Sequence, residues 1–191
     1  WDLIISNTYN RNEPGVYFID NANRFNNLIY YQKVTGTNPC GEISMLADGG
    51  VWVDPKTGVV YKHLGDICNL GTLNLTEYFD YDYSPLQSFK RWAFDFDAFA
   101  ADMRLLVRGL DNLIDCGGYP LEELKTAAKL RRKIGAGIMG YGSLLMMMGI
   151  RYGSERAMKF TEDLMKVMAN VGYDESAEIA KEKGPFLLYN E

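Results

Sequence analysis

Three side chains with chemical potential lie on alternate residues in the first quarter of the chain: the amide of Asn38, the thiol of Cys40 and the carboxylate of Glu42. In an extended segment, positions i, i+2 and i+4 point to the same side, so these groups are expected to face one space. Pro39 restricts itself and Asn38 to extended backbone, while Gly41 permits a turn or a close approach to a ligand. The pattern predicts a short loop that holds a reactive sulfur at its tip.

The neighbouring charge indicates which chemistry this thiol suits. A carboxylate disfavours a nearby thiolate, whereas a cysteine hydrolase needs a thiolate and pairs it with histidine. His63 is the only histidine, and the sequence suggests no pairing with a cysteine, which makes a hydrolase the poorest candidate. Cys40 is instead expected to act as a neutral hydrogen-atom donor and acceptor, with Glu42 moving protons. The alternative is an ordinary Asn-Pro turn beside a small buried cysteine.

Two further cysteines occur downstream. Cys68 lies in segment 67–75, where apolar and polar residues nearly alternate, which predicts an extended segment with Cys68 and Leu70 on one side. A cysteine in an apolar strand is often structural, but a second thiol within reach of Cys40 would allow a two-electron reduction. Cys116 precedes two glycines at a predicted helix end and is interpreted as structural or incidental.

The elements expected to position these residues are both extended and helical. In the first half, segment 13–20 predicts a turn and a short buried strand, and 21–32 predicts a helix with Phe25, Leu28 and Ile29 on one face. A hairpin is predicted from apolar triplets 51–53 and 59–61 around a Pro- and Gly-containing turn at 54–58.

In the second half, apolar residues recur every three or four positions from 95 to 113, which predicts an amphipathic helix. Further helices are predicted from about 121 to the basic residues 131–133 and over 154–183, the latter capped by Ser154, broken near Gly172 and ended by Gly184. Segment 134–140 predicts a strand. Its GxGxxG spacing lacks the context of a dinucleotide site, so packing is favoured. The basic residues 131–133 are expected on a solvated face or as helix C-terminal charges, and residues 146–148 in helix core or at an interface.

Composition excludes several classes of protein. The 191 residues are 47% hydrophobic and 24% charged, as in a globular protein. A net charge of -5 and a pI near 5.0 argue against a general nucleic-acid binder. No apolar run is long enough for a membrane span, and the N-terminal residues do not resemble a signal peptide. Three cysteines and one histidine predict neither a disulfide framework nor a metal site, which favours a reduced, cytoplasmic setting.

Five segments, in order, resemble the catalytic (large) subunit of ribonucleotide reductase: 13–20 (EPGVYFID), 38–42 (NPCGE), 68–75 (CNLGTLNL), 132–140 (RKIGAGIMG) and 177–186 (AEIAKEKGPF). The resemblance implies an α/β fold, part of a ten-stranded α/β barrel with a central finger loop that carries Cys40. It implies that Cys40 becomes a thiyl radical and abstracts the ribose 3′ hydrogen, that Glu42 is the base on the 3′ hydroxyl, and that Asn38 binds the sugar. Cys68 would be one of two thiols that reduce C2′ and close to a disulfide.

Catalytic subunits of this family are much longer than this chain. The partner thiol of Cys68, the specificity loops, the phosphate-binding segment and the C-terminal cysteine pair are not in the sequence. The chain, which lacks an initial Met, is therefore expected to be an interior segment, residues 1–191, of a single catalytic barrel domain, inactive alone. The alternative is a non-catalytic assembly module or a remnant of a split reductase.

The resemblance also implies partners and cofactors. Glu42 argues against the anaerobic glycyl-radical class, whose similar site lacks that acid. The motifs resemble both the adenosylcobalamin class (class II) and the class with a separate subunit that carries a radical-generating metal cofactor (class I), with a slight preference for adenosylcobalamin. The expected partners are ribonucleoside di- or triphosphates, a thioredoxin-like or glutaredoxin-like reductant, the remaining parts of the catalytic subunit and a second copy in a homo-oligomer.

Overall fold

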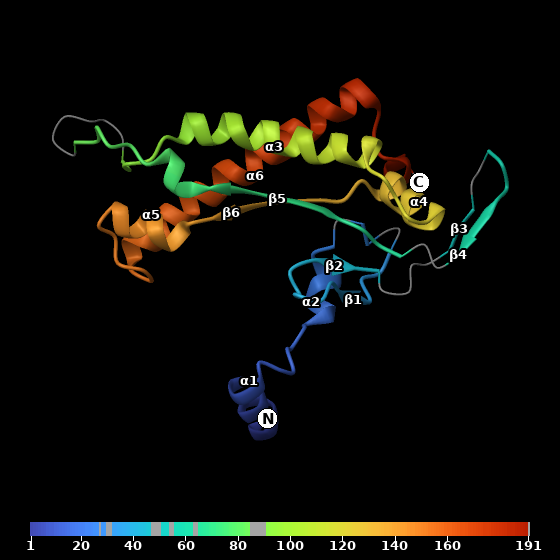
Figure 1. The fold of residues 1–191 in the computed structure, drawn as a ribbon, viewed down its shortest axis with the longest axis horizontal. Helices are drawn as coiled ribbons and strands as arrows, with labels where there is room; N and C mark the ends of the chain where they lie inside the picture. The colour runs from blue at the N-terminus through green and yellow to red at the C-terminus, as the bar shows by residue number, and fades with distance from the viewer. Residues whose placement is uncertain are drawn as a thin grey trace. The chain divides into compact units, whose positions relative to one another are not determined.

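Two parallel strands and the helices beside them lie in the larger of the two units of the protein (Figure 1). The computed structural model describes residues 1–26, 28–29, 32–46, 51–53, 56–62, 65–84 and 91–190. The chain divides into two compact units, Trp1–Asp66 and Ile67–Glu191. Both helices and strands occur, so the fold class is α/β as predicted.

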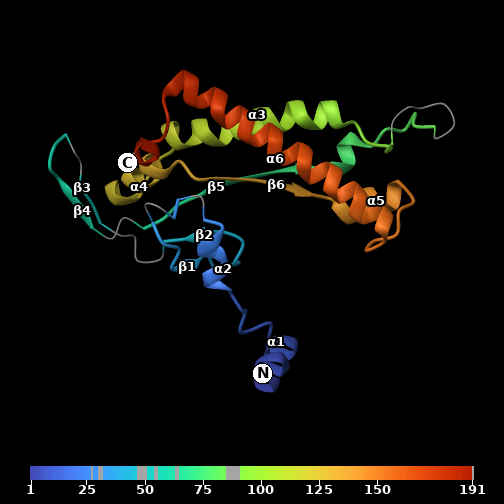
Figure 2. The same ribbon diagram turned by 180° about the vertical axis from the view of Figure 1, so that it is seen from behind.

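In the second unit, β5 (Asn69–Asn74) and β6 (Ile134–Met139) pair in parallel, with Leu70 opposite Gly135 and Leu73 opposite Ile138. Parallel neighbours require a long crossover, which is made here by α3 (Phe96–Cys116) and α4 (Glu122–Arg131). Helix α3 contacts both strands and also α6 (Glu155–Lys183), and both views show α3 and α6 running together along the strand pair (Figures 1 and 2).

Local sequence explains where these helices begin and which face they bury. The carboxylate of Asp95 accepts hydrogen bonds from the backbone of Asp97 and Ala98 at the start of α3, and Ser154 Oγ accepts one from Ala157 at the start of α6. Apolar residues three or four apart then turn inward. The buried core residues of α3 and α6 are Phe99, Met103, Val107, Leu110, Ile114, Ala157, Phe160, Leu164, Val171 and Ile179.

An aromatic cluster closes one end of this core. Phe94 packs edge-to-face or tilted against Tyr78, Phe99 and Phe160 with ring centroids 5.5–5.8 Å apart. Tyr78 belongs to the 3₁₀ helix η1 (Leu75–Tyr78), which continues from β5. Burial, followed by a hydrogen bond to Asp102, raises the pKa of Tyr78 to about 12. The rest of the unit consists of α5 (Tyr141–Met147) and η2 (Leu187–Asn190).

The first unit contains two helices, α1 (Asp2–Arg11) and α2 (Ile19–Arg24), and two hairpins. One hairpin pairs β1 (Gly36–Thr37) with β2 (Ser44–Met45), and the other pairs β3 (Val51–Val53) with β4 (Val60–Lys62). The second of these confirms the hairpin predicted around segment 54–58, although Asp54 and Pro55 of its turn lie outside the described residues.

Two predictions in the first unit are wrong. Segment 13–20 forms no strand, since its backbone is irregular up to Phe18 and then enters α2. The helix predicted over 21–32 is shorter and begins earlier, and of its expected apolar face only Leu28 is buried. The physical reason is Asn26, whose side chain accepts a hydrogen bond from Leu28 N and donates one to Gln32 O, so it stabilises a turn after α2.

Most of the helices and strands predicted for the second unit are confirmed. Helices α3, α4 and α6 and strands β5 and β6 are confirmed, but α6 continues unbroken through Gly172. Met146 is exposed, whereas Met148 packs against the core. Among the described residues the strands form three separate two-stranded sheets and no closed barrel. No helix in that part of the chain is long and apolar enough to traverse a membrane.

Candidate functional site

The predicted reactive loop connects β1 to β2 and contains a hydrogen-bonded turn. Gly41 N donates to Asn38 O at 3.0 Å, and Asn38 N donates to Ile43 O at 3.2 Å. Pro39 occupies the second position of the turn, where its fixed φ is favourable, and Gly41 adopts a φ of 81° that suits glycine. Cys40 therefore lies near the tip of the hairpin, with a free and exposed thiol.

The side chains of Asn38 and Glu42 meet across the base of this turn. Asn38 Nδ2 donates to Glu42 Oε1 at 2.5 Å, and Asn38 Oδ1 accepts a hydrogen bond from Ile43 N at 3.0 Å. The expected extended segment with alternating side chains is wrong, because the backbone turns between Asn38 and Gly41. The turn itself, rather than strand alternation, brings the amide and the carboxylate together.

Residues outside the motif hold this hairpin within the first unit. Asn23 of α2 donates to Val34 O at 2.9 Å and accepts a hydrogen bond from Val34 N at 2.7 Å, two residues before β1. The hydroxyls of Tyr17 and Ser44 are 2.7 Å apart and hydrogen-bonded. Sequence reasoning missed Asn23 and Tyr17 as positioning residues. Tyr17 lies in segment 13–20, but nothing in the spacing links it to Ser44.

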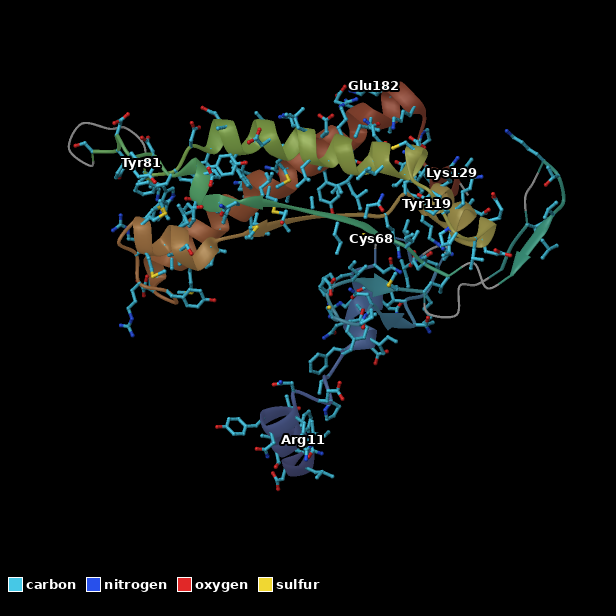
Figure 3. The ribbon with its side chains drawn as sticks, in the orientation of Figure 1. Arg11, Cys68, Tyr81, Tyr119, Lys129 and Glu182 are labelled. Atoms are coloured by element: carbon cyan, nitrogen blue, oxygen red, sulfur yellow. The ribbon has the colours of Figure 1, made fainter. Side chains whose placement is uncertain are left out.

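Cys68 belongs to the second unit and lies directly before β5 (Figure 3). Its side chain is half-buried, and its thiol donates a hydrogen bond to Asn69 O at 3.7 Å. A Cβ placed on Gly135 of β6 would meet both Leu70 Cδ2, at 2.3 Å, and Cys68 Sγ, at 3.6 Å. Cys68 and Leu70 therefore lie on the same side of the strand pair, as predicted.

The glycines of segment 135–140 serve packing, which confirms the interpretation of the GxGxxG spacing. Gly135 faces Leu70, and Gly137 leaves only 3.1 Å between an added Cβ and Thr72 Cγ2. Gly140, with a φ of 75°, starts α5 beside the side chain of Asn74. Cys116 lies at the end of α3 with an exposed, free thiol.

A cluster of four charged residues, the Arg132 cluster, joins the ends of α3, α4 and α6. Arg132 donates to both Asp111 and Asp115 at 2.8 Å, and Lys183 Nζ contacts the same two carboxylates at 2.7 and 2.9 Å. The expected solvated face at 131–133 is thus wrong, since Arg131 is only 5% exposed and Arg132 is paired. The alternative, positive charge at a helix C-terminus, is confirmed.

The ion pairs shift the pKa values of the charged groups in the Arg132 cluster. Burial opposes ionisation of Asp111, but hydrogen bonds from Arg132 and Lys183 outweigh it and lower the pKa of Asp111 below its ordinary value. The same two donors, Arg132 first, hold the pKa of Asp115 well below its usual range. Hydrogen bonds to the aspartates raise the pKa of Lys183. These groups are charged at neutral pH, and their ion pairs link the ends of α3, α4 and α6.

The described part of the chain also contains a pocket away from these residues. A cavity of about 390 Å³ lies between residues 91–97, which lead into α3, and the first half of α6, and none of the four predicted site residues lines it. Its polar wall contains Asp163, which accepts hydrogen bonds from Trp92 Nε1 at 2.8 Å and from Arg91 at 3.2 Å. No group of three or more potential metal ligands occurs among the described residues, which do not include His63.

Comparison with known proteins gives these features a context. The model of the family described as "Ribonucleotide reductase, barrel domain" matches residues 1–191. A vitamin B12-dependent ribonucleoside-diphosphate reductase of Thermoplasma acidophilum is 31% identical over 186 residues, covering 97% of this chain and 21% of the relative. The enzyme of the same name from Mycobacterium tuberculosis is 31% identical over 191 residues, covering 100% of the chain and 24% of the relative.

The similarity extends to relatives whose names do not mention the vitamin. The ribonucleoside-diphosphate reductase subunit alpha of Chlamydia pneumoniae is 28% identical over 190 residues, covering 100% of this chain and 16% of the relative. The chain thus spans about a quarter or less of the length of these relatives. Because the family match extends over every residue, the chain belongs to the ribonucleotide reductase barrel domain family.

Proposed function

We propose that this chain is an interior segment of a ribonucleotide reductase catalytic subunit and carries its radical cysteine. The observation that carries the proposal is the loop between β1 and β2, where Cys40 is exposed between Asn38 and Glu42 in the sequence and the side chains of these two residues are hydrogen-bonded. The family match over the whole chain supports it. An exposed thiol at the tip of a short hairpin suits a group that must approach a substrate.

Cys40 is the proposed hydrogen-atom carrier. As a thiyl radical it takes the hydrogen atom from C3′ of the ribose, which forms the S–H bond of Cys40 and leaves a carbon radical on the sugar. Glu42 takes the proton of the 3′ hydroxyl, and the bond from Asn38 keeps the carboxylate directed toward the loop. Asn38 also hydrogen-bonds the sugar.

Cys68 is the proposed source of reducing equivalents, together with a second thiol from outside this chain. The 2′ hydroxyl leaves as water, two thiols supply two electrons and two protons, and the sulfurs join in a disulfide. The hydrogen atom then returns from Cys40 to C3′, which regenerates the radical. The net reaction converts a ribonucleotide and a dithiol into a deoxyribonucleotide, water and a disulfide, and a thioredoxin-like or glutaredoxin-like protein reduces the disulfide.

The proposed setting is a single ten-stranded α/β barrel in the complete subunit, of which β5 and β6 supply two parallel strands. A two-stranded parallel sheet is seldom stable alone and has open edges on both sides. Strands from the rest of the subunit would pair with these edges. The 191-residue chain alone is therefore proposed to be inactive.

The proposed cofactor is adenosylcobalamin, because several relatives are named vitamin B12-dependent. When bound, it would supply the radical that activates Cys40. The described residues form no recognisable site for a cobalamin, so only Cys40 is assigned a role toward it. Ribonucleoside diphosphates are the proposed substrates on the same grounds, and a cytoplasmic homo-oligomer is the proposed form.

The test uses the full-length protein that contains this segment, with a 3′-tritiated ribonucleoside diphosphate, a dithiol and adenosylcobalamin present or omitted. Cys40→Ser should abolish both deoxynucleotide formation and loss of tritium from C3′. The tritium that Cys40 abstracts is held as an S–T bond, which exchanges with water, so part of it is lost instead of returning to C3′. Cys68→Ser should abolish only deoxynucleotide formation, because the first hydrogen transfer does not need that thiol. Cys116→Ser, at the exposed end of α3, is the matched control. Full turnover by Cys40→Ser would refute the proposal and favour a non-catalytic assembly role.

A further inference from the structure

Gly135 of β6 lies close to the sulfur of Cys68, and the faces of the strand pair show on which side it lies. Gly71 faces α3, because a Cβ there would lie 2.6 Å from Leu106 Cδ1. Successive strand residues alternate between faces, so Leu70 points to the opposite face, where it is 56% exposed. Gly135 is the register partner of Leu70, so its missing side chain belongs to that same face.

On the face that carries Leu70, there is little space beside Gly135. The position of a Cβ on Gly135 is 2.3 Å from Leu70 Cδ2, which is far inside van der Waals contact, and 3.6 Å from Cys68 Sγ. Leu70 and the sulfur are therefore neighbours around the room that Gly135 leaves. A methyl group there would force Leu70 to move while touching the sulfur directly.

We propose that Gly135 is a positioning residue for the thiol of Cys68, acting through the room it leaves for Leu70. The inference rests on the reductase function proposed above and extends it to a residue on the neighbouring strand. A thiol that must react with a specific carbon radical is sensitive to small displacements, and a misplacement of about 1 Å can lower a rate about 100-fold.

Gly137 provides a matched control on the same strand and the same face. A Cβ on Gly137 would meet Thr72 Cγ2 at 3.1 Å and Gly71 O at 3.7 Å, and it does not approach Cys68. Gly135→Ala and Gly137→Ala add the same methyl group two residues apart. They differ in the overlap that the methyl group makes, at 2.3 Å from Leu70 against 3.1 Å from Thr72, and in whether it lies beside the sulfur.

The experiment uses the full-length reductase and measures deoxynucleotide formed and tritium lost from C3′ in the same reaction. Gly135→Ala should lower the number of deoxynucleotides formed per tritium lost by about 10-fold or more, since hydrogen abstraction by Cys40 continues while reduction fails. Gly137→Ala should leave this ratio unchanged. A purely structural effect would lower both quantities together, and a parental ratio in Gly135→Ala would overturn the proposal.

A double-mutant cycle with Leu70→Ala tests the steric route. Gly135→Ala should have little effect on the ratio when Leu70 is already alanine, and an equally large effect in both backgrounds would overturn the proposal. If Gly135→Ala does not fold, the comparison of Gly135→Ala/Leu70→Ala with Leu70→Ala decides in the same way. Failure of the double variant to fold as well would also overturn it. If the parent protein shows neither product nor tritium loss, the proposed function itself has failed.

Discussion

Replacing Arg132 with alanine should lower the free energy of opening the region where α3, α4 and α6 end by about 3 kcal/mol. Arg132 donates to the Asp111 carboxylate at 2.8 Å and to its carbonyl at 3.0 Å, and Asp111 is only 8% exposed. A hydrogen bond to a charged group contributes about 1.5–3 kcal/mol. The bonds to Asp115 add little, because that side chain is 45% exposed and surface pairs contribute at most about 1 kcal/mol.

Lys183 limits the loss. It continues to contact both aspartates after Arg132 is removed, so the effect should stay at the lower end of the roughly 3–5 kcal/mol expected when a buried ion pair is broken. The backbone provides an internal comparison, since Arg132 ends α4 with a φ of 47°. That left-handed conformation costs a non-glycine residue about 1–2 kcal/mol. Arg132→Gly should therefore be about 1 kcal/mol less destabilising than Arg132→Ala.

The assay is native-state hydrogen exchange on the full-length protein, followed by mass spectrometry of peptides from α4 and from the last turns of α6. Lys125→Ala is the control, because it removes a positive charge from α4 whose partner Glu122 is exposed, and it should change opening by about 0.5 kcal/mol or less. Equal protection in Arg132→Ala and Lys125→Ala would refute the reasoning. So would greater damage from Arg132→Gly than from Arg132→Ala.

Three further predictions follow from the same structure. Folding lowers the pKa values of Asp111 and Asp115, so the stabilisation by the Arg132 cluster is present above about pH 4 and is lost as the pH falls through the lowered values. Hydrogen exchange measured between pH 5 and 2 should show a steeper loss of protection in the parent than in Arg132→Ala, and an equal dependence on pH in both would contradict this. Gly41→Ala should lower turnover, because a φ of 81° costs alanine about 1–2 kcal/mol, although there is open space for the added methyl group. An unchanged kcat would show that the loop tolerates another conformation. Asn23→Ala removes two hydrogen bonds to the backbone of Val34, so it should lower the free energy of opening measured by hydrogen exchange in peptide 32–46 by about 2 kcal/mol. Protection equal to that of the parent would mean that α2 does not hold the hairpin.

The helices of the second unit were predictable because their signals are local. The caps Asp95 and Ser154 and the apolar spacing within α3 and α6 lie inside the segments they specify. The break predicted near Gly172 in α6 is wrong, because a glycine weakens a helix by up to about 1 kcal/mol without ending it. Val171 and Glu175 are buried on either side of it, and tertiary packing of this kind outweighs a propensity of that size.

The first unit was harder to predict for the opposite reason. Its helix α2 is short, and Asn26 stabilises the turn that follows through hydrogen bonds with the backbone two and six residues ahead. Apolar spacing over 21–32 resembled a helix because periodicity takes no account of such side-chain bonds. Segment 13–20 had the composition of a strand, but no strand of the described residues pairs with it.

For the candidate site, the sequence alone determined the chemical groups: an amide, a thiol and a carboxylate within five residues, a second thiol before a strand, and a family resemblance that the whole-chain match confirms. Only the tertiary structure decided how they are held. The Asn38–Glu42 bond arises from a turn instead of strand alternation, Asn23 of another element hydrogen-bonds Val34 just before the hairpin, and Gly135 lies beside Cys68 although the two are 67 positions apart in the sequence. Residue types and spacing report local preferences, whereas contacts between distant segments depend on how the whole chain packs.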